Sequence, residues 1–340
     1  MNRKVGTPAT ILLVLLLLVA AFGSRGYGQT LPASTLEIDL ENFVQYLEDS
    51  SDLSRFATNP GVTPAAAPKN FNFQLQIGDI VAVNGQPAKG TFTRNFRQVS
   101  LTASPNPGQA IADTVRNAVV ADTFEILKGD GTPIGTIVAY GTGGGAPPLG
   151  GPLSITQGNF AITGGTGAFL GARGQLGQAV TPQTVAARQA SVTEDPANRR
   201  RNGGGRVRFV LQVIPLSAPQ MLMTQTGPLI THADSTIVSA SRPATAGETL
   251  SLFVTGLGPT RVAVDPGQPF PPSPLAEVNS TVQVTVNGRP ADVLSAVGFP
   301  GQVDTYQVNV RVPPGIGGGT ARLQVTAAWI AGPAVNIPVQ

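Results

Sequence analysis

The residues of this sequence that could do chemistry are few. The 340 residues include no cysteine and a single histidine, at position 232. The lack of cysteine excludes disulfides, thiolate metal sites and cysteine nucleophiles, and one histidine excludes multi-histidine zinc or iron sites. A serine–histidine–aspartate triad would have to use His232, yet no serine stands in a Gly-x-Ser-x-Gly setting. We therefore expect no metal, no cofactor and no catalytic residue.

The densest motif is a glycine-rich stretch at residues 162–171, ITGGTGAFLG. A dinucleotide-binding turn would need a strand before it, a helix after it and an open parallel sheet around it. Residues 172–177, ARGQLG, are too rich in glycine for that helix, and no Gly-Lys-Ser/Thr is present for a P-loop. We interpret Gly164, Gly165 and Gly167 as a structural turn in which one or more residues take positive φ.

The one basic cluster contains five arginines around three glycines at 203–205, at an expected hairpin tip. Its members are Arg199, Arg200, Arg201, Arg206 and Arg208. The pattern favours a solvated, mobile turn. A contact for anionic surface polymers is the alternative.

The elements that position these residues are mostly strands. Residues 70–215 contain about eight β-rich runs with short connections, and the first ends at Asn84-Gly85, where both positions tolerate positive φ. The runs are 75–83, 91–101, 115–127, 134–140, 153–163, 171–178, 184–193 and 206–214. The spacing predicts an all-β fold with a closed eight-stranded antiparallel barrel, which leaves no exposed sheet edge.

An N-terminal segment, residues 32–57, is predicted to be the one helix. Ser34 and Glu37 have capping-box spacing. The apolar residues that then recur at helical intervals are Leu36, Leu40, Phe43 and Leu47. Residues 29–69 are therefore expected to be a helix and a Pro/Ala linker. The apolar stripe is expected to pack on the next domain, and a partner-binding helix is the alternative.

Three blocks of the 70–215 region resemble dirigent proteins and allene oxide cyclases. Residues 160–169 and 172–174, FAITGGTGAF and ARG, resemble the family's signature. Residues 78–84, GDIVAVN, resemble its early strand, and residues 129–141 its central glycine-punctuated hairpin. The resemblance implies an eight-stranded antiparallel barrel whose largely apolar lumen holds a small hydrophobic ligand.

The resemblance also suggests which side chains contact that ligand. Arg173 matches the arginine of the family's Ala-Arg-Gly stretch, whereas Asn84 stands where pathway-active dirigent proteins have acidic residues. Glu125 and Tyr140 lie on expected strands, where each faces either the lumen or the solvent. These four are the predicted ligand-binding residues.

Residues 217–340 form a second expected domain. Four β-rich runs, separated by Gly-Pro, Asn-Gly and Pro-Pro-Gly turns, predict a small all-β sandwich. The runs are 249–255, 282–286, 304–312 and 321–328. Residues 246–260, 284–291 and 306–313 resemble a domain common at the C-termini of exported soil-bacterial proteins. That resemblance implies an immunoglobulin-like sandwich related to the transcription-factor-type domains, with no known catalytic residues.

Residues 1–28 are predicted to be an export signal. Arg3 and Lys4 precede an apolar run at 11–22, which is shorter than the roughly 20 residues that cross a bilayer. A retained N-terminal anchor is the alternative. Cleavage after residue 28 removes three of the 22 basic residues and leaves 19 against 19 acidic ones. The mature chain is then close to neutral, and we expect no nucleic acid partner.

These patterns predict a non-catalytic protein that is secreted, periplasmic or at the cell surface. Its barrel would hold a small hydrophobic ligand, and its second domain would attach to a surface polymer or protein. No membrane span is expected in the mature chain, and an oligomer is compatible with the fold.

The alternatives are an isomerase or cyclase acting on a reactive lipid or phenolic intermediate, and a structural envelope or adhesion protein. An acid–base pair in an open cavity favours the enzyme, an apolar cavity the binding protein, and a filled lumen the structural protein.

Overall fold

The computed structural model of the chain describes residues 33–49, 70–100, 117–143, 155–191, 193–214, 216–265 and 267–340. The predicted export signal and Pro/Ala linker lie outside these residues. Within the described ranges, no helix has the length and apolar character needed to cross a bilayer.

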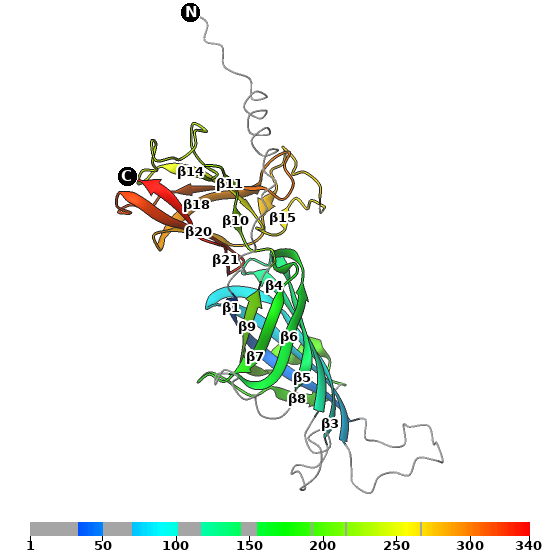
Figure 1. Cartoon of the computed structure of the whole chain (residues 1–340). Coiled ribbons are helices and arrows are strands. Elements are labelled where there is room, and N and C mark those ends of the chain that lie inside the picture. Colours follow the sequence, from blue (N-terminus) through cyan, green and yellow to red (C-terminus); the bar gives the residue numbers. More distant parts are fainter. Residues whose placement is uncertain are drawn as a thin grey trace, which may run out of the picture. The chain divides into compact units, whose positions relative to one another are not determined.

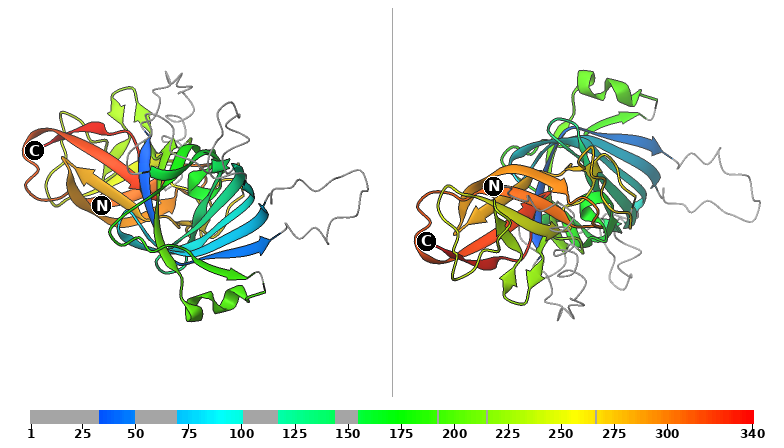
Figure 2. Two further views of the ribbon diagram at one scale, coloured as in Figure 1. Left: turned by 90° about the horizontal axis from the view of Figure 1, so that it is seen from below. Right: turned by 90° about the horizontal axis from the view of Figure 1, so that it is seen from above.

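Eight of the described strands close into an antiparallel barrel (Figures 1 and 2). Their order around the barrel is β1-β2-β3-β4-β5-β6-β7-β9, and pairing of β9 with β1 closes it. The strands are β1 (Ser34–Asp49), β2 (Asn70–Val83), β3 (Gln86–Ser100), β4 (Asn117–Lys128), β5 (Pro133–Gly143), β6 (Ile155–Gly165), β7 (Arg173–Ala179) and β9 (Gly205–Ile214). The predicted all-β fold with a closed eight-stranded barrel is thus confirmed.

The predicted N-terminal helix is wrong, because its described part is strand β1. Leu36, Ile38 and Leu40 are fully buried, and the acidic residues between them are not. This alternation with a period of two is typical of a strand with one face in a core. The barrel therefore begins before residue 70, and β1 is one of its eight strands.

A bulge explains why β1 resembles a helix in sequence. The pairing of β1 with β9 shifts register between Leu40 and Phe43, and Asn42 has φ of 49°. The irregularity moves the next buried apolar residue from position 42 to position 43, and a spacing of three imitates a helical turn. Long-range pairing with β2 and β9 then overrides the local helical signals.

The predicted strand at residues 184–193 is not one of the barrel strands. Only β8 (Arg188–Ser191) forms there, and it pairs in parallel with the end of β1. The segment continues through the 3₁₀-helix η3 (Pro196–Asn198) and the short helix α3 (Arg199–Asn202) before β9 begins. Figure 2 shows this insertion, in green, beside the blue and cyan strands of the barrel.

The second region, after residue 216, forms a nearly closed antiparallel sheet with its own apolar core. Buried residues such as Leu250, Leu252, Val308 and Val310 belong to that core. The strands of the main sheet are β10 (Gln220–Met221), β13 (Ile230–His232), β14 (Thr249–Thr255), β15 (Thr260–Arg261), β16 (Glu277–Val278), β17 (Val282–Val286), β18 (Arg289–Gly298), β19 (Tyr306–Arg311), β20 (Gly319–Ala327), β21 (Ile330–Ala331) and β22 (Val335–Val339). A separate hairpin pairs β11 (Met223–Thr224) with β12 (Gly227–Pro228).

The glycine-rich stretch ends β6 and continues into the 3₁₀-helix η2 (Gly167–Phe169). Gly167 has φ of 60°, a conformation that residues other than glycine rarely adopt. A Cβ on Gly165 would lie against the carbonyl oxygens of Phe169 and Thr136, whereas a Cβ on Gly164 would meet no atom within 4 Å. The three glycines therefore differ in what they require.

We expect Gly165→Ala to destabilise the barrel by about 1–3 kcal/mol, because backbone atoms must move to admit the new methyl group. Gly164→Ala is the matched control and should be close to neutral. Urea unfolding followed by circular dichroism measures both. Equal stability of the two variants would show that packing does not constrain this turn.

Candidate functional site

The four residues predicted to bind ligand do not meet inside the barrel. Asn84 occupies the β2–β3 turn, where its side chain accepts a hydrogen bond from the N–H of Glu37 at 2.7 Å and donates to the carbonyl of Thr35 at 3.2 Å. It ties the hairpin to β1. Arg173, the first residue of β7, is exposed and donates to two backbone carbonyls, one of them that of Ala172 at 2.9 Å.

Glu125 and Tyr140 lie on the outer surface of the barrel. Glu125 is exposed between the buried Phe124 and Ile126, and Tyr140 is 54% exposed. Successive strand residues point to opposite faces, so both side chains point away from the core. None of the four predicted residues lines the described lumen.

His232 is buried and enclosed by its neighbours. Its Nδ1 lies 3.3 Å from Oε2 of Glu248, and its Nε2 lies 3.3 Å from the carbonyl oxygen of Arg242. Each ring nitrogen therefore faces an acceptor oxygen of the protein itself. The described residues contain no group of three or more side chains that could hold a metal ion.

The middle of the lumen is filled by four rings, which we call the phenylalanine plug. The ring of Phe92 lies 4.8 Å from those of Phe124 and Phe209 and 5.9 Å from that of Phe43, centroid to centroid. All four residues are at most 2% exposed. Rings at these separations are in contact, so the plug leaves no room for a ligand between them.

Beside the plug, polar side chains continue across four neighbouring strands, and we call them the polar layer. It consists of Gln45 on β1, Gln76 on β2, Arg94 on β3 and Asp122 on β4. Each lies directly opposite the next in the strand register. Gln76 Nε2 donates to Gln45 Oε1 at 3.0 Å. The polar layer is therefore built by register, from residues far apart in the sequence.

The centre of this layer is a buried ion pair. Arg94 donates through Nε and Nη2 to the two carboxylate oxygens of Asp122, each at 2.7 Å, and the side chains are 6% and 0% exposed. The guanidinium carbon lies 5.6, 4.9 and 5.1 Å from the ring centroids of Phe92, Phe160 and Phe209. These cation–π contacts and the bidentate bonds offset part of the cost of removing two charges from water.

One acceptor of the polar layer has no partner. Gln76 is 8% exposed, and its Oε1 is buried and finds no hydrogen-bond donor among the described residues. A buried acceptor left in this way costs about 1–3 kcal/mol. A bound molecule that donated an N–H or O–H group to this oxygen would remove that cost.

Sequence reasoning missed the ion pair, although a signal for it exists. In β3, Arg94 stands in phase with the inward-facing Phe92, and in β4, Asp122 stands in phase with Val120 and Phe124. Opposite charges at inward positions of two adjacent strands predict a pair only when the register is known.

The basic cluster is largely exposed, as predicted for a solvated turn, with the Arg200 and Arg206 side chains 69% and 54% exposed, but most of its arginines are ion-paired. Its first residues form α3, where Arg199 contacts Asp79 and Arg200 binds the same carboxylate through Nε at 2.8 Å and Nη2 at 2.9 Å. Asn42, in the β1 bulge, donates to Asp79 Oδ2 at 2.9 Å. Among the five arginines, only Arg201 forms no ion pair with a described residue.

These contacts lower the pKa of Asp79. Burial by itself raises the pKa of this carboxyl group. Hydrogen bonds from Arg200 and Asn42, together with the positive charges of Arg199 and Arg200, outweigh that effect and hold the pKa below its usual value. The carboxylate therefore stays ionised and anchors α3 to the barrel.

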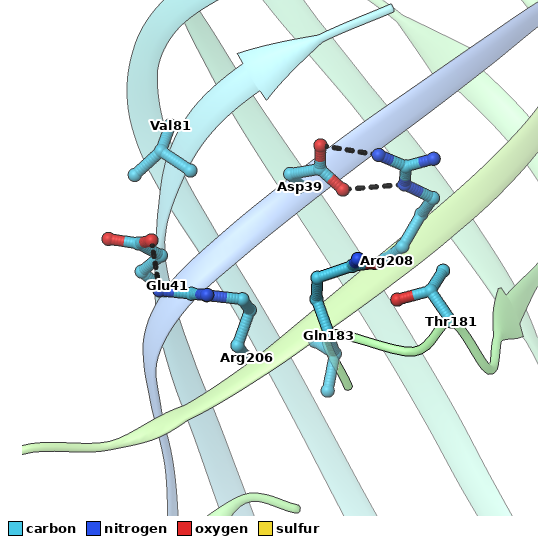
Figure 3. Close-up of a pocket in the computed structure, with 8 residues that line it drawn as sticks. Asp39, Glu41, Val81, Thr181, Gln183, Arg206 and Arg208 are labelled. Carbon is cyan, nitrogen blue, oxygen red and sulfur yellow. Dashed lines mark hydrogen bonds and ion pairs between the residues drawn. The ribbon is translucent and has the colours of Figure 1, made fainter. Parts of the chain in front are cut away.

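Two arginines of the cluster, Arg206 and Arg208, line a groove on the outer surface of the barrel (Figure 3). Arg208 of β9 binds both carboxylate oxygens of Asp39 on β1, at 2.6 and 2.8 Å, and Arg206 contacts Glu41 at 2.8 Å. The groove thus lies along the seam where β9 meets β1, outside the lumen.

Comparisons with known proteins identify no family. No protein-family model and no curated protein matches the sequence. Among solved structures, a polysaccharide lyase is 10% identical with a TM-score of 0.17 over 90% of this chain and 40% of its own. A Binjari virus protein is 8% identical with a TM-score of 0.15 over 91% and 70%. The chain spans less than half of the lyase, and TM-scores this low establish no shared fold.

We expect Asp122→Ala to destabilise the barrel by about 3–5 kcal/mol, because it leaves the charge of Arg94 buried without a partner. The double variant Arg94→Met/Asp122→Leu removes both charges and should recover most of that loss. Chemical unfolding of the two variants gives the comparison. A double variant as unstable as the single one would contradict the assignment of the loss to an unpaired charge.

We expect the anchoring of α3 to weaken in acid. The pKa of Asp79 is lower in the folded state than in the unfolded state. Its contribution to stability is therefore complete above the unfolded-state pKa of about 3.9 and is lost as the pH falls through the folded-state pKa. Asp79→Asn should remove the contribution at neutral pH and speed amide hydrogen exchange in residues 197–202. Asp130→Asn, in the exposed turn between β4 and β5, is the control. Unchanged exchange in Asp79→Asn would contradict the anchor.

Proposed function

We propose that this chain is an exported, non-catalytic binding protein whose barrel holds a small hydrophobic ligand against the polar layer. In this proposal residues 217–340 are an immunoglobulin-like module that attaches the protein to a surface polymer or protein. The barrel is proposed to be a relative of dirigent proteins and allene oxide cyclases. The basic start and short apolar run of residues 1–28 support export.

The observation that supports ligand binding most directly is the unpartnered Oε1 of Gln76. A barrel that served only as a packed scaffold would be as stable, or more so, with apolar residues at the positions of Arg94 and Asp122. Keeping a buried ion pair and an unpaired acceptor in one layer costs stability. A ligand that donates a hydrogen bond to Gln76 would repay that cost, with Phe96 and Phe160 beside its apolar part.

The hydrogen bonding of the Asp122 carboxylate supports a binding role rather than a catalytic one. General acid–base catalysis needs a group that can exchange a proton with the substrate. Both carboxylate oxygens of Asp122 accept hydrogen bonds from Arg94. The pair therefore acts as a fixed, neutral dipole that orients a polar group.

A structural envelope or adhesion protein is the second candidate, because the phenylalanine plug fills the middle of the lumen. The two functions differ in whether the space next to the polar layer accepts a molecule. In the structural protein, the unpartnered acceptor would serve no ligand and the barrel would bind no apolar probe.

The two functions can be separated with N-phenyl-1-naphthylamine, a neutral apolar probe that has one N–H donor. We expect the purified chain to bind it with increased fluorescence, and Gln76→Leu to weaken binding roughly tenfold through loss of the acceptor. Gln175→Leu is the matched control, because Gln175 pairs with Gln212 on the outer surface. No binding by the wild type, or equal binding by Gln76→Leu, would contradict the proposal.

A further inference from the structure

A groove on the outside of the barrel has a lining suited to a different ligand. It encloses about 270 Å³ between strands β1 and β9 and the loop that follows β7. That volume is just below the roughly 300–1,000 Å³ of typical small-molecule sites, so it suits one small molecule. The polar residues that line it are Asp39, Glu41, Thr181, Gln183, Arg206 and Arg208, with Val81 at one side (Figure 3).

The loop wall of the groove is held in place by the backbone. Val185 and Arg206 exchange two backbone hydrogen bonds, of 2.7 and 2.9 Å. Gly205 permits this approach, because a Cβ there would collide with the carbonyl oxygens of Ala186 and Val185. The Oγ1 of Thr184 accepts from the N–H of Thr181 at 2.8 Å and closes the turn. The wall is therefore formed before any ligand binds, which reduces the entropy lost on binding.

The two ion pairs in the groove are not equivalent. Arg208 uses all three of its nitrogens, two on Asp39 and the third on Glu37 at 2.8 Å, which leaves two of its five N–H groups without an ion-pair partner among the described residues. Arg206 and Glu41 share a single nitrogen–oxygen contact, and their side chains are 54% and 42% exposed. Further N–H groups of Arg206 and the second oxygen of Glu41 therefore stay available to a ligand.

We propose that this groove binds a small neutral polyol, such as a single sugar ring or a cyclitol. A vicinal diol can donate one hydroxyl to Glu41 and accept with the other from Arg206, so it bridges the pair without breaking it. Thr181 and Gln183 supply additional neutral donors and acceptors. Charged groups make roughly twice as strong hydrogen bonds as neutral ones, which compensates for the absence of an aromatic platform among the lining residues.

The charge balance of the groove favours a neutral ligand over an ion. Its two carboxylates and two guanidinium groups are paired with each other, and Glu37 adds a further negative charge at Arg208. An anion at the free N–H groups of Arg206 would lie beside the carboxylate of Glu41, and a cation at the free oxygen of Glu41 would lie beside the guanidinium group of Arg206, so like charges would oppose either ion. A polyol leaves every ion pair intact.

The test is saturation-transfer NMR on the full-length chain with myo-inositol and methyl α-glucopyranoside, together with tetramethylammonium as a cationic probe and inorganic sulfate as an anionic competitor of the polyol signal. We expect at least one polyol to bind with millimolar affinity and neither charged probe to bind in the groove. Glu41→Ala should weaken polyol binding roughly tenfold. Gln183 is exposed and forms none of the ion pairs. Gln183→Ala should therefore weaken polyol binding less than Glu41→Ala does and leave the melting temperature unchanged.

The matched control is Asp234→Asn in the second region. Asp234 pairs with Arg242 at 2.7 Å, and the two side chains are 52% and 49% exposed, much like the Glu41–Arg206 pair. It should not change polyol binding. No polyol signal in the wild type, equal binding by Glu41→Ala, displacement of the polyol by sulfate, or binding of tetramethylammonium at this groove would overturn the proposal. None of these results depends on whether the lumen binds an apolar ligand.

Discussion

The ion pair of Arg94 and Asp122 sets the conditions that the rest of the barrel has to meet. The two charged side chains are at most 6% exposed, so their geometry must be kept closely. Loss of one of their hydrogen bonds would leave a charge incompletely paired in a low-dielectric interior. The register of β3 against β4 brings the two side chains directly opposite each other. The phenyl rings beneath the guanidinium and the amides beside it then complete its surroundings.

Charge pairing also organises the outside of the barrel. The closing seam joins β1 to β9, whose residues are about 170 positions apart, and Asp39 faces Arg208 across it. The insertion before β9 is anchored by Arg199 and Arg200 on Asp79. The cluster that looks basic in the sequence is thus mostly neutralised by carboxylates from distant strands. Local charge in a β protein says little about net surface charge until the register is known.

The sequence predicts the barrel well where strands are regular. Alternation in residues 206–214 and the Asn84-Gly85 turn indicate β9 and the β2–β3 hairpin, because both signals are local. Two runs of the second region, 249–255 and 282–286, coincide with β14 and β17. Strand β1 is missed because its bulge at Asn42 shifts the apolar spacing from two to three. The number of barrel strands is right although one of the eight is misassigned.

The candidate site is less predictable than the fold for the same reason. Glu125 and Tyr140 are residue types that often bind ligands, but neighbouring residues of a strand point to opposite faces of the sheet, and both of these side chains point outward. Arg94 and Asp122 are charged residues of the kind that usually lies on the surface, and only the alignment of β3 with β4 shows that they form a buried pair. The groove forms only where a loop and two strands come together in the fold. Gly205 is the one feature of the sequence that we connect with it, because the loop backbone approaches β9 too closely there for a Cβ.

The claim on which the proposed function depends is that the buried pair orients a bound molecule. Native mass spectrometry of the intact purified chain tests it directly, with the double variant Arg94→Met/Asp122→Leu measured beside the wild type. We predict that the wild type retains a small-molecule adduct and that the folded double variant lacks it. The same adduct mass on both proteins, or no adduct on either, would contradict the claim.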